Sequence, residues 1–395
     1  MKSRPDTWRE FFFPRKTQEK KIFLKDAKRF DFILLIFIIT LCLYGTIMVM
    51  SAGSAYAEFR YGDKYYFLRR QIFFLVLGLF LMYLTSRIKS TVWYNLAFPL
   101  YLVTILLLVL VLVIGLVGNG AKRWISIGPL TLQPSEIAKF TMVLLLCKYF
   151  TVNEEKAILS RKKKDIFLYG TVFPFIIIGA IVFLVMLQKH LSCIIILGLI
   201  GISLMFVSGI RLRYLSTFLG CGIAGVGAFA LLTDYTKERI TVWQNPELYK
   251  LTGGWQTLQG LMAIGSGGLG GLGLGNGLLK YCYISEPAND MIFTVLCEET
   301  GFLGATVTIL LFSLFLFRGY SIAMCTESTF EKLLAFGICS KITIQLLLNI
   351  AVVTNTIPNT GISLPFFSYG GSSLLMLLFE MGVLLSISRN STLIK

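Results

Sequence analysis

The chain has 395 residues, of which 55% are hydrophobic and only 15% are charged, and its formal net charge is +16. A soluble protein of this composition would expose large apolar patches, so an ordinary soluble globular domain is excluded and a helical membrane protein is favoured. The positive charge is typical of topogenic lysine and arginine and of attraction to anionic membrane lipid. No soluble basic module is long enough to predict a nucleic-acid partner.

Apolar runs follow one another along most of the chain, and ten of them are interpreted as membrane spans. They cover residues 31–51, 71–86, 93–117, 134–151, 166–187, 191–209, 214–233, 291–317, 331–354 and 372–388. Lysine and arginine are about twice as frequent in the tails and even-to-odd loops as in the opposite loops. The sequence therefore predicts an all-α polytopic membrane protein with ten transmembrane helices and both termini in the cytoplasm.

The same pattern predicts the organisation of the chain. Residues 1–30 form a basic cytoplasmic tail, residues 31–388 the membrane domain, and residues 389–395 a cytoplasmic C-terminal tail. No cleavable signal peptide is evident, so the first span is expected to act as a signal anchor. The segment 234–290, between the seventh and eighth spans, is a large extracytoplasmic loop, and outer loops of this length usually carry function.

Cysteine and histidine do not predict a metal site. The eight cysteines show no CxxC pair, most of them fall in apolar runs, and His190 is the single histidine. A disulfide framework is therefore not expected, and no cofactor is evident. The absence of a visible internal repeat gives no support to an inverted-repeat transporter.

The segment GSGGLG, Gly265–Gly270, matches the G-x-G-x-x-G pattern of dinucleotide-binding turns. No strand precedes it and no βαβ unit surrounds it, so the nucleotide interpretation is rejected. Glycine is expected here to permit close backbone approach or a re-entrant turn.

The segment QPSEIAK opens the fourth span. Pro134 suits the first helical turn, and Glu136 and Lys139 are i,i+3 neighbours on one helix face. An ionisable pair within a span indicates function, because charges in a membrane are costly. The alternative is a structural salt bridge that orders the bundle.

Arg123 and Trp124 lie in KRWISIG at an outer interface. Arg123 is a candidate pyrophosphate clamp, because a guanidinium group pairs with phosphate in a forked geometry. Lipid-headgroup contact for Arg123 and an aromatic belt for Trp124 are equally compatible with the spacing.

The segment NTGISLPFFSYGGSS, residues 359–373, is rich in proline and glycine at the mouth of the last span. Such backbone is expected to line a cavity rather than to face lipid. Ser368, Ser372 and Ser373 are candidate hydrogen-bond donors to a polar ligand, beside a helix start that favours an anion. A tightly packed turn is the alternative.

Two carboxylates, Glu286 and Asp290, stand just before the eighth span in SEPANDMIF. If the helix begins near Pro287, Asp290 lies in its first turn, where a carboxylate caps the helix dipole. The catalytic interpretation competes with this capping role. Glu298 and Glu299 follow deeper in the span, where they require partners. Lys341 or Arg318 are the expected partners.

Several of these motifs together resemble the SEDS proteins (shape, elongation, division and sporulation), and within them the FtsW-like division branch. The motifs are GTIMVMSAGSAYA, LRRQIFFLVLGL, NGAKRWISIGPLTLQPSEIAKF, GGWQTLQGLMAIGSGGLGGLGLGNG, SEPANDMIFTVLCEETGFLGA and PNTGISLPFFSYGGSS. The resemblance runs from Gly45 to the C-terminus.

The resemblance implies a peptidoglycan glycosyltransferase that polymerises lipid II at the outer leaflet of the cytoplasmic membrane. It implies a class B penicillin-binding protein transpeptidase and other division proteins as partners, and a location at the division septum. The family pattern P-E-x-H-x-D-F places its essential acid on Asp290. The chain departs from this pattern at Ser285, Ala288 and Met291, and it reads QKHLSC where the family often has an acidic motif.

The predicted mechanism assigns Asp290 the role of general base toward the 4-hydroxyl of the acceptor sugar. The remaining motif residues form a predicted substrate-binding set. This set is Arg123, Trp124, Gln133, Glu136, Lys139, Gln256, Gln259, Glu286, Ser368 and Ser372. Arg123 and Lys139 are expected to offset pyrophosphate charge, and a divalent Mg or Mn ion is a further candidate. The alternatives are a lipid II flippase and a non-catalytic division scaffold.

Overall fold

The computed structural model describes residues 30–118, 121–128, 130–160, 162–232, 234–278, 280–281, 283 and 286–394. The predicted basic tail therefore lies outside the described residues except for Phe30, and so does Ser285.

Helices account for most of the described residues. The α-helices are α2 (Phe32–Tyr61), α3 (Tyr66–Arg87), α4 (Ser90–Ile114), α5 (Pro134–Val152), α6 (Lys163–Phe167), α7 (Phe173–Leu187), α8 (Leu191–Val207), α9 (Leu212–Leu232), α10 (Asp234–Gln244), α11 (Trp255–Ser266), α12 (Ile292–Met324), α13 (Thr329–Val353) and α14 (Gly371–Ser388).

The remaining elements are short. Two π-helical turns, η1 (Glu155–Leu159) and η2 (Leu168–Val172), flank α6, and a 3₁₀ turn, η3 (Thr392–Ile394), ends the chain. The π-turn η2 joins α6 to α7 without a break, so residues Lys163–Leu187 form one stretch that is long and apolar enough to be a candidate span.

Helices cover all ten apolar runs that were interpreted as spans. Within the described residues, seven helical stretches are long and apolar enough to cross a membrane: Phe32–Tyr61, Tyr66–Arg87, Ser90–Ile114, Lys163–Leu187, Ile292–Met324, Thr329–Val353 and Gly371–Ser388. Helix α8 is apolar but has only 17 residues. Helices α2 and α12, with 30 and 33 residues, are longer than their predicted spans and would reach about 45–50 Å at 1.5 Å per residue.

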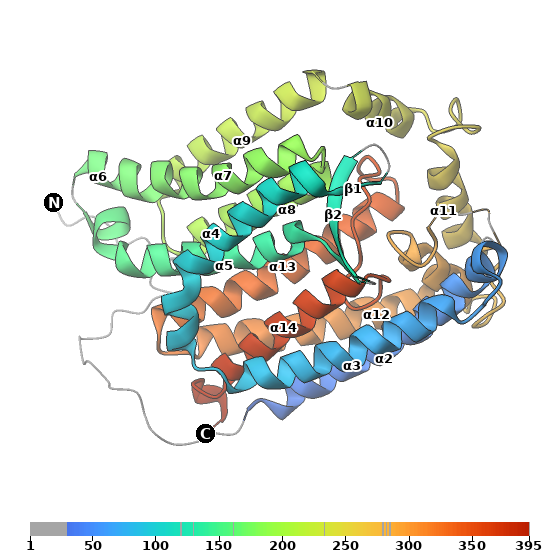
Figure 1. The fold of residues 1–395 in the computed structure, drawn as a ribbon, viewed down its shortest axis with the longest axis horizontal. Helices are drawn as coiled ribbons and strands as arrows, with labels where there is room; N and C mark the ends of the chain where they lie inside the picture. Colours follow the sequence, from blue (N-terminus) through green and yellow to red (C-terminus); the bar gives the residue numbers. More distant parts are fainter. Residues whose placement is uncertain are drawn as a thin grey trace.

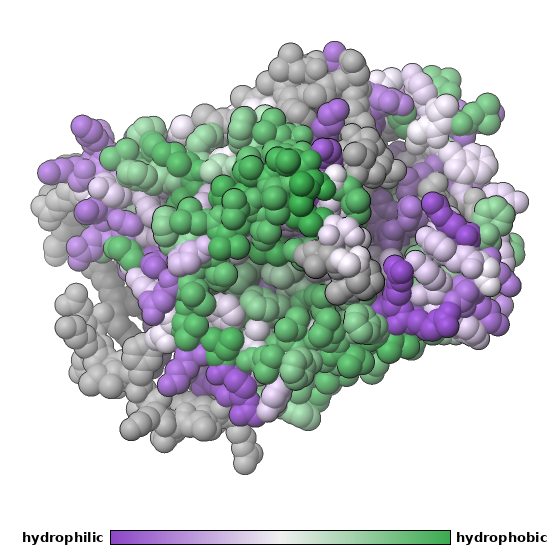
Figure 2. All heavy atoms as spheres, in the orientation of Figure 1, coloured by the Kyte–Doolittle hydropathy of each residue, from purple (hydrophilic) through white to green (hydrophobic). Residues whose placement is uncertain are grey.

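The long helices run roughly along one direction and form a single bundle (Figure 1). Figure 2 shows a broad hydrophobic surface over the middle of the visible face, with hydrophilic residues gathered toward both ends. This distribution is that of a protein whose middle faces hydrocarbon. Helices α10 and α11 and the small sheet lie toward one end (Figure 1). At the other end, the Asp31 amide donates to Ser388 Oγ at 3.0 Å, which joins the start of α2 to the end of α14.

The all-α prediction needs one correction, because a three-stranded antiparallel sheet precedes α5. Strand β2 (Ala121–Ile127) pairs with both β1 (Leu116–Gly118) and β3 (Leu130–Leu132). Gly128 turns the β2–β3 hairpin with a positive φ of 61°. The alternation of apolar and polar residues in WISI and LTL is the signal for these strands.

Small residues bring α14 close to α3. A side chain at Gly78 would overlap Leu378, and one at Gly382 would overlap Thr85 and Met82. Close approach of backbones at glycine is a common way in which membrane helices associate. This contact fixes the start of α14, and with it the preceding segment, at the same end of the bundle as α10 and α11.

Candidate active site

Asp290 lies in a short non-helical stretch immediately before α12. The helix begins at Ile292, so Asp290 is two residues outside it, and the predicted first-turn capping position is wrong. Glu286 is exposed, has a left-handed φ of 52°, and accepts a hydrogen bond from Asn289 Nδ2 at 2.6 Å. We call residues 286–291 the acid loop.

The acid loop is tied to the segment 355–370, which we call the re-entrant segment. The Tyr369 amide donates to the Ala288 carbonyl at 2.8 Å, and Ser368 Oγ donates to the Asn289 carbonyl at 2.7 Å. Asn349 Nδ2 on α13 donates both to the Asp290 carbonyl, at 2.9 Å, and to the Ile362 carbonyl, at 2.6 Å. Three neighbouring residues of the acid loop are thereby fixed by backbone and neutral side-chain donors.

The re-entrant segment turns into the bundle instead of covering it. Ile362, Leu364, Phe366 and Phe367 are buried, and a side chain at Gly45 on α2 would overlap the Phe366 carbonyl. Irregular backbone at this position is tolerated because it is surrounded by protein. The apolar part of this stretch is therefore packed inside the protein, which agrees with the expected cavity-lining backbone and with the alternative of a tightly packed turn.

The Asp290 carboxylate faces this segment. A Cβ at Gly361 would lie 3.2 Å from Asp290 Oδ2, and Gly361 has a φ of 67°, so glycine is favoured there by space and by backbone. Among the described residues, buried Asp290 Oδ1 has no hydrogen-bond partner. Burial, and to a smaller extent the nearby Glu286 carboxylate, raises the pKa of Asp290 to about 6. Hydrogen bonding to the backbone at Asp290 opposes this rise in pKa, and so, to a smaller extent, do Arg239 and the backbone at Met291.

A cavity of about 240 Å³ lies at Asn359, two residues before Gly361, and Asp290 itself does not line it. Its walls come from α10 and from the start of α11, and Asn359 of the re-entrant segment closes it. The Arg239 guanidinium donates to the Asn359 carbonyl, and Trp243 Nε1 donates to the Asn355 carbonyl at 2.9 Å. Asn359 Nδ2 donates to Gln256 Oε1 at 3.1 Å. Residues of the segment 234–290, which was predicted to be an outer loop, therefore contact the re-entrant segment directly.

A cluster of paired charges lies deeper in the bundle. Lys139 Nζ is 2.8 Å from both carboxylate oxygens of Glu136, and Lys341 Nζ is 2.5 Å from Glu380 Oε2. All four side chains are buried, so each cation compensates a carboxylate. A water-sized cavity of about 20 Å³ extends from Glu136 and Lys341 to Ser368, which itself holds the acid loop.

Arg123 contacts the junction between α7 and α8. Its Nη2 donates to the Lys189 carbonyl at 2.6 Å, and its Nε is 3.5 Å from the Gln188 carbonyl. Burial, with Arg123 and Lys139 nearby, lowers the pKa of His190 to about 3, so this imidazole is neutral at physiological pH. Ser192 Oγ donates to the Thr360 carbonyl, so the divergent QKHLSC segment is joined to the re-entrant segment.

The other members of the predicted substrate-binding set have different environments. Ser368 Oγ is engaged with the acid loop and accepts from the Leu364 amide at 2.7 Å, while Ser372 Oγ donates to the Thr131 carbonyl at 2.5 Å. These two hydroxyls therefore hold backbone segments together. Gln133, which precedes α5, and Gln259 are buried, and Trp124 on β2 is half-buried.

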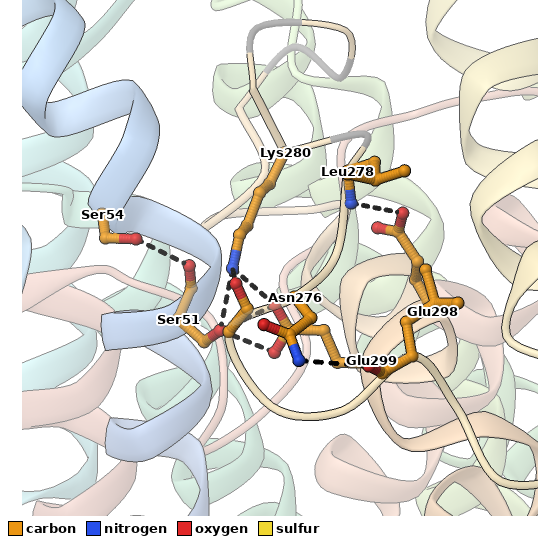
Figure 3. A network of polar contacts seen from close by, with 9 residues as sticks. Ser51, Ser54, Asn276, Leu278, Lys280, Glu298 and Glu299 are labelled. Atoms are coloured by element: carbon orange, nitrogen blue, oxygen red, sulfur yellow. Dashed lines mark hydrogen bonds and ion pairs between the residues drawn. The ribbon is translucent and has the colours of Figure 1, made fainter.

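Figure 3 shows a second buried network, which the sequence did not predict. Lys280 Nζ is 2.7 Å from Glu299 Oε1 and 2.9 Å from the Gly275 carbonyl. Ser51 Oγ on α2 donates to the same carboxylate at 2.6–2.7 Å. The predicted partners of Glu299 were wrong, because Arg318 pairs with Asp31 at 2.7 Å and Lys341 pairs with Glu380.

The glycine-rich segment packs against a break in α12. The helix loses its helical geometry at Gly301, where φ is 65°. The Leu272 and Gly273 amides donate to the Glu298 and Glu299 carbonyls at 3.0 and 2.9 Å. The Leu278 amide donates to Glu298 Oε1 at 2.8 Å. The predicted close backbone approach is confirmed.

Metal binding remains a prediction. In the part of the chain that the structure describes, no group of three or more His, Cys, Asp or Glu side chains is placed to hold a metal ion.

Comparison with known proteins places this geometry in a family. A family of cell cycle proteins named for FtsW, RodA and SpoVE matches residues 32–393. Stage V sporulation protein E of Bacillus subtilis is 39% identical over 364 residues, which are 91% of this chain and 97% of that protein. A probable peptidoglycan glycosyltransferase FtsW of Geobacter sulfurreducens is 35% identical over 369 residues, which are 92% of this chain and 96% of that protein.

Solved structures agree with this relationship. A chain from a study of polymerisation and crosslinking by a peptidoglycan synthase complex has a TM-score of 0.76 and 28% identity, covering 91% of this chain and 98% of its own. The rod shape determining protein RodA of Thermus thermophilus has a TM-score of 0.68 and 28% identity, covering 92% and 98%. With its match over residues 32–393, the chain belongs to the FtsW/RodA/SpoVE family of cell cycle proteins, as its motifs predicted.

Proposed function

We propose that this chain is a peptidoglycan glycosyltransferase that polymerises lipid II into glycan strands. Its relatives include proteins named as probable peptidoglycan glycosyltransferases, and one structural neighbour comes from a peptidoglycan synthase complex. The observation that carries the proposal is Asp290: its backbone carbonyl is held by Asn349, its carboxyl pKa is raised, and its buried Oδ1 has no hydrogen-bond partner among the described residues.

The proposed reaction assigns Asp290 the role of general base. Asp290 accepts the proton from the 4-hydroxyl of the acceptor's terminal N-acetylglucosamine, and that oxygen forms a bond to the anomeric carbon of the donor N-acetylmuramic acid. The bond from that carbon to undecaprenyl pyrophosphate breaks, and the leaving group takes the electron pair. An α-linked donor gives a β-1,4 bond, so the reaction is an inversion that needs one base and no covalent intermediate. A carboxylate with a pKa near 6 is ionised at neutral pH and still basic enough to act.

The membrane arrangement belongs to the same proposal. Ten transmembrane helices with both termini in the cytoplasm place the acid loop, the re-entrant segment and residues 234–290 at the outer face of the cytoplasmic membrane, where lipid II is used. Short α8 and charged α5 then cross as inner members of the bundle, since most side chains of α5 are buried. The proposed partners are a class B penicillin-binding protein transpeptidase and other division proteins. The proposed location is the division septum.

The test is Asp290→Asn in proteoliposomes that also contain the partner transpeptidase. We expect glycan synthesis from lipid II to fall about 10²–10⁴-fold, because the general base is lost while the side chain keeps its shape. Melting of the purified variant should match that of the wild type. Glu247→Gln, a neutralised exposed carboxylate in the same outer segment, is the control and should retain synthesis.

Unchanged polymerisation by Asp290→Asn would refute the base assignment. Movement of labelled lipid II across the bilayer without polymer would instead support a flippase. Normal division by cells that carry only Asp290→Asn would support a non-catalytic scaffold.

A further inference from the structure

The cavity between α10 and α11 has a chemical character of its own. Glu238 and Arg239 bring one charge of each sign, and Gln256, Thr257 and Asn359 bring amide and hydroxyl groups. The Trp243 indole N–H is already bonded to the Asn355 carbonyl, so the indole lines the cavity mainly with its apolar ring. Mixed amide, hydroxyl and aromatic surface without a net charge fits a neutral sugar ring better than a pyrophosphate.

The volume of the cavity sets the size of its occupant. Pockets that hold drug-sized ligands usually measure about 300–1,000 Å³. At about 240 Å³ this cavity holds a single sugar ring, and a disaccharide with its peptide must extend out of it.

The cavity is linked to Asp290 through two residues of the re-entrant segment. Asn359 closes the cavity, and its Oδ1 accepts a hydrogen bond from the Gly361 amide at 3.2 Å. Gly361 is the residue whose Cβ position lies 3.2 Å from Asp290 Oδ2. The cavity and the Asp290 carboxylate therefore adjoin the same short stretch of the re-entrant segment, residues 359–361.

We infer that this cavity is the subsite for the terminal sugar ring of the acceptor, with Gln256, Thr257 and Asn359 as its hydrogen-bonding residues. The inference rests on the proposed glycosyltransferase function. Arg239 is a positioning residue, because its guanidinium holds the Asn359 carbonyl at the mouth of the cavity.

The test separates the acceptor from the donor. Lipid II that lacks the 4-hydroxyl of its terminal sugar can serve only as donor, and it is supplied at a saturating concentration. Ordinary labelled lipid II serves as acceptor, and its concentration is varied over a low range. Formation of the first coupled product is measured for the wild type, Gln256→Met and Thr257→Val. Gln244→Met is the matched control, because Gln244 is exposed on α10 and does not line the cavity.

We expect Gln256→Met and Thr257→Val each to raise KM for the acceptor about tenfold, with a smaller change in kcat and no change in KM for the donor. Gln244→Met should behave as the wild type. Thr257→Val preserves the shape of the side chain. If a melting experiment shows that Gln256→Met is poorly folded, the acceptor KM of Thr257→Val alone decides whether the subsite is correct.

An unchanged acceptor KM in both variants would overturn the subsite. A rise confined to the donor KM would overturn its assignment to the acceptor. Failure of the proposed function is distinguishable from either result, because the wild type itself would then form no coupled product.

Discussion

Two carboxylates near the start of α12 have opposite environments. Glu299 accepts hydrogen bonds from Lys280 and Ser51 and lies between α2 and the glycine-rich segment. Asp290, nine positions earlier, has a buried oxygen without a partner among the described residues and a cavity nearby. A fully satisfied buried group holds structure together, whereas an unsatisfied one in a native protein calls for a ligand or a chemical role. The difference separates the acid that organises the fold from the acid proposed to react.

The largest expected effect on stability is that of Lys280→Met, which leaves Glu299 buried with a hydroxyl but without its cation. Breaking a buried ion pair on one side costs about 3–5 kcal/mol, so the free energy of unfolding should fall by about that amount. Denaturant or thermal unfolding in detergent measures it. Lys250→Met, at an exposed lysine of the same outer segment, is the control. A wild-type melting curve for Lys280→Met would show that this network does not organise the fold.

Ser51→Ala is expected to have an intermediate effect. Its hydroxyl donates to an ionised carboxylate, and hydrogen bonds to charged groups contribute about 1.5–3 kcal/mol. The matched variant Ser54→Ala removes a bond to the Ser51 carbonyl, a neutral acceptor, and should lose only about 0.5–1.5 kcal/mol. Equal losses in the two variants would contradict the ranking.

The smallest expected effect is a shift of the pH profile. Because the base must be ionised, kcat/KM should fall below pH about 6, about tenfold for each further pH unit. Glu286 is a like charge that raises the pKa of Asp290, so Glu286→Gln should move this limb to lower pH. Arg239→Gln should move it to higher pH, because Arg239 lowers that pKa. If the acidic limb of the pH profile stays in place in both variants, or moves in the opposite direction, the electrostatic account of the Asp290 pKa is contradicted.

The sequence predicted the helices well because apolar runs in a membrane protein are long and uniform. The C-terminal ends of α7, α13 and α14 lie within one residue of the C-terminal limits predicted for these spans. Helix α12, in contrast, continues seven residues beyond the C-terminal limit of its predicted span. The strands around Trp124 were missed because three short segments in a polar loop give a weak alternating signal.

The site was predictable in part. The Glu136–Lys139 pair could be predicted because i,i+3 spacing fixes it locally. The partner of Glu299 could not be predicted, since Lys280 reaches it only after the glycine-rich segment folds back onto α12. Likewise, the hydroxyls of Ser368 and Ser372 look available in the sequence, and only tertiary structure shows which carbonyls they bind.

The re-entrant segment contains no charged residue, and it holds the acid loop through amide and hydroxyl donors alone. Dissolved ions screen exposed charges over about 8 Å at physiological ionic strength, but they leave buried neutral hydrogen bonds unchanged. The hydrogen bonds that hold the acid-loop backbone around Asp290 are therefore expected to be little affected by salt. If the proposed site faces the medium outside the cell, its acid loop would then keep its place when the ionic strength of that medium changes.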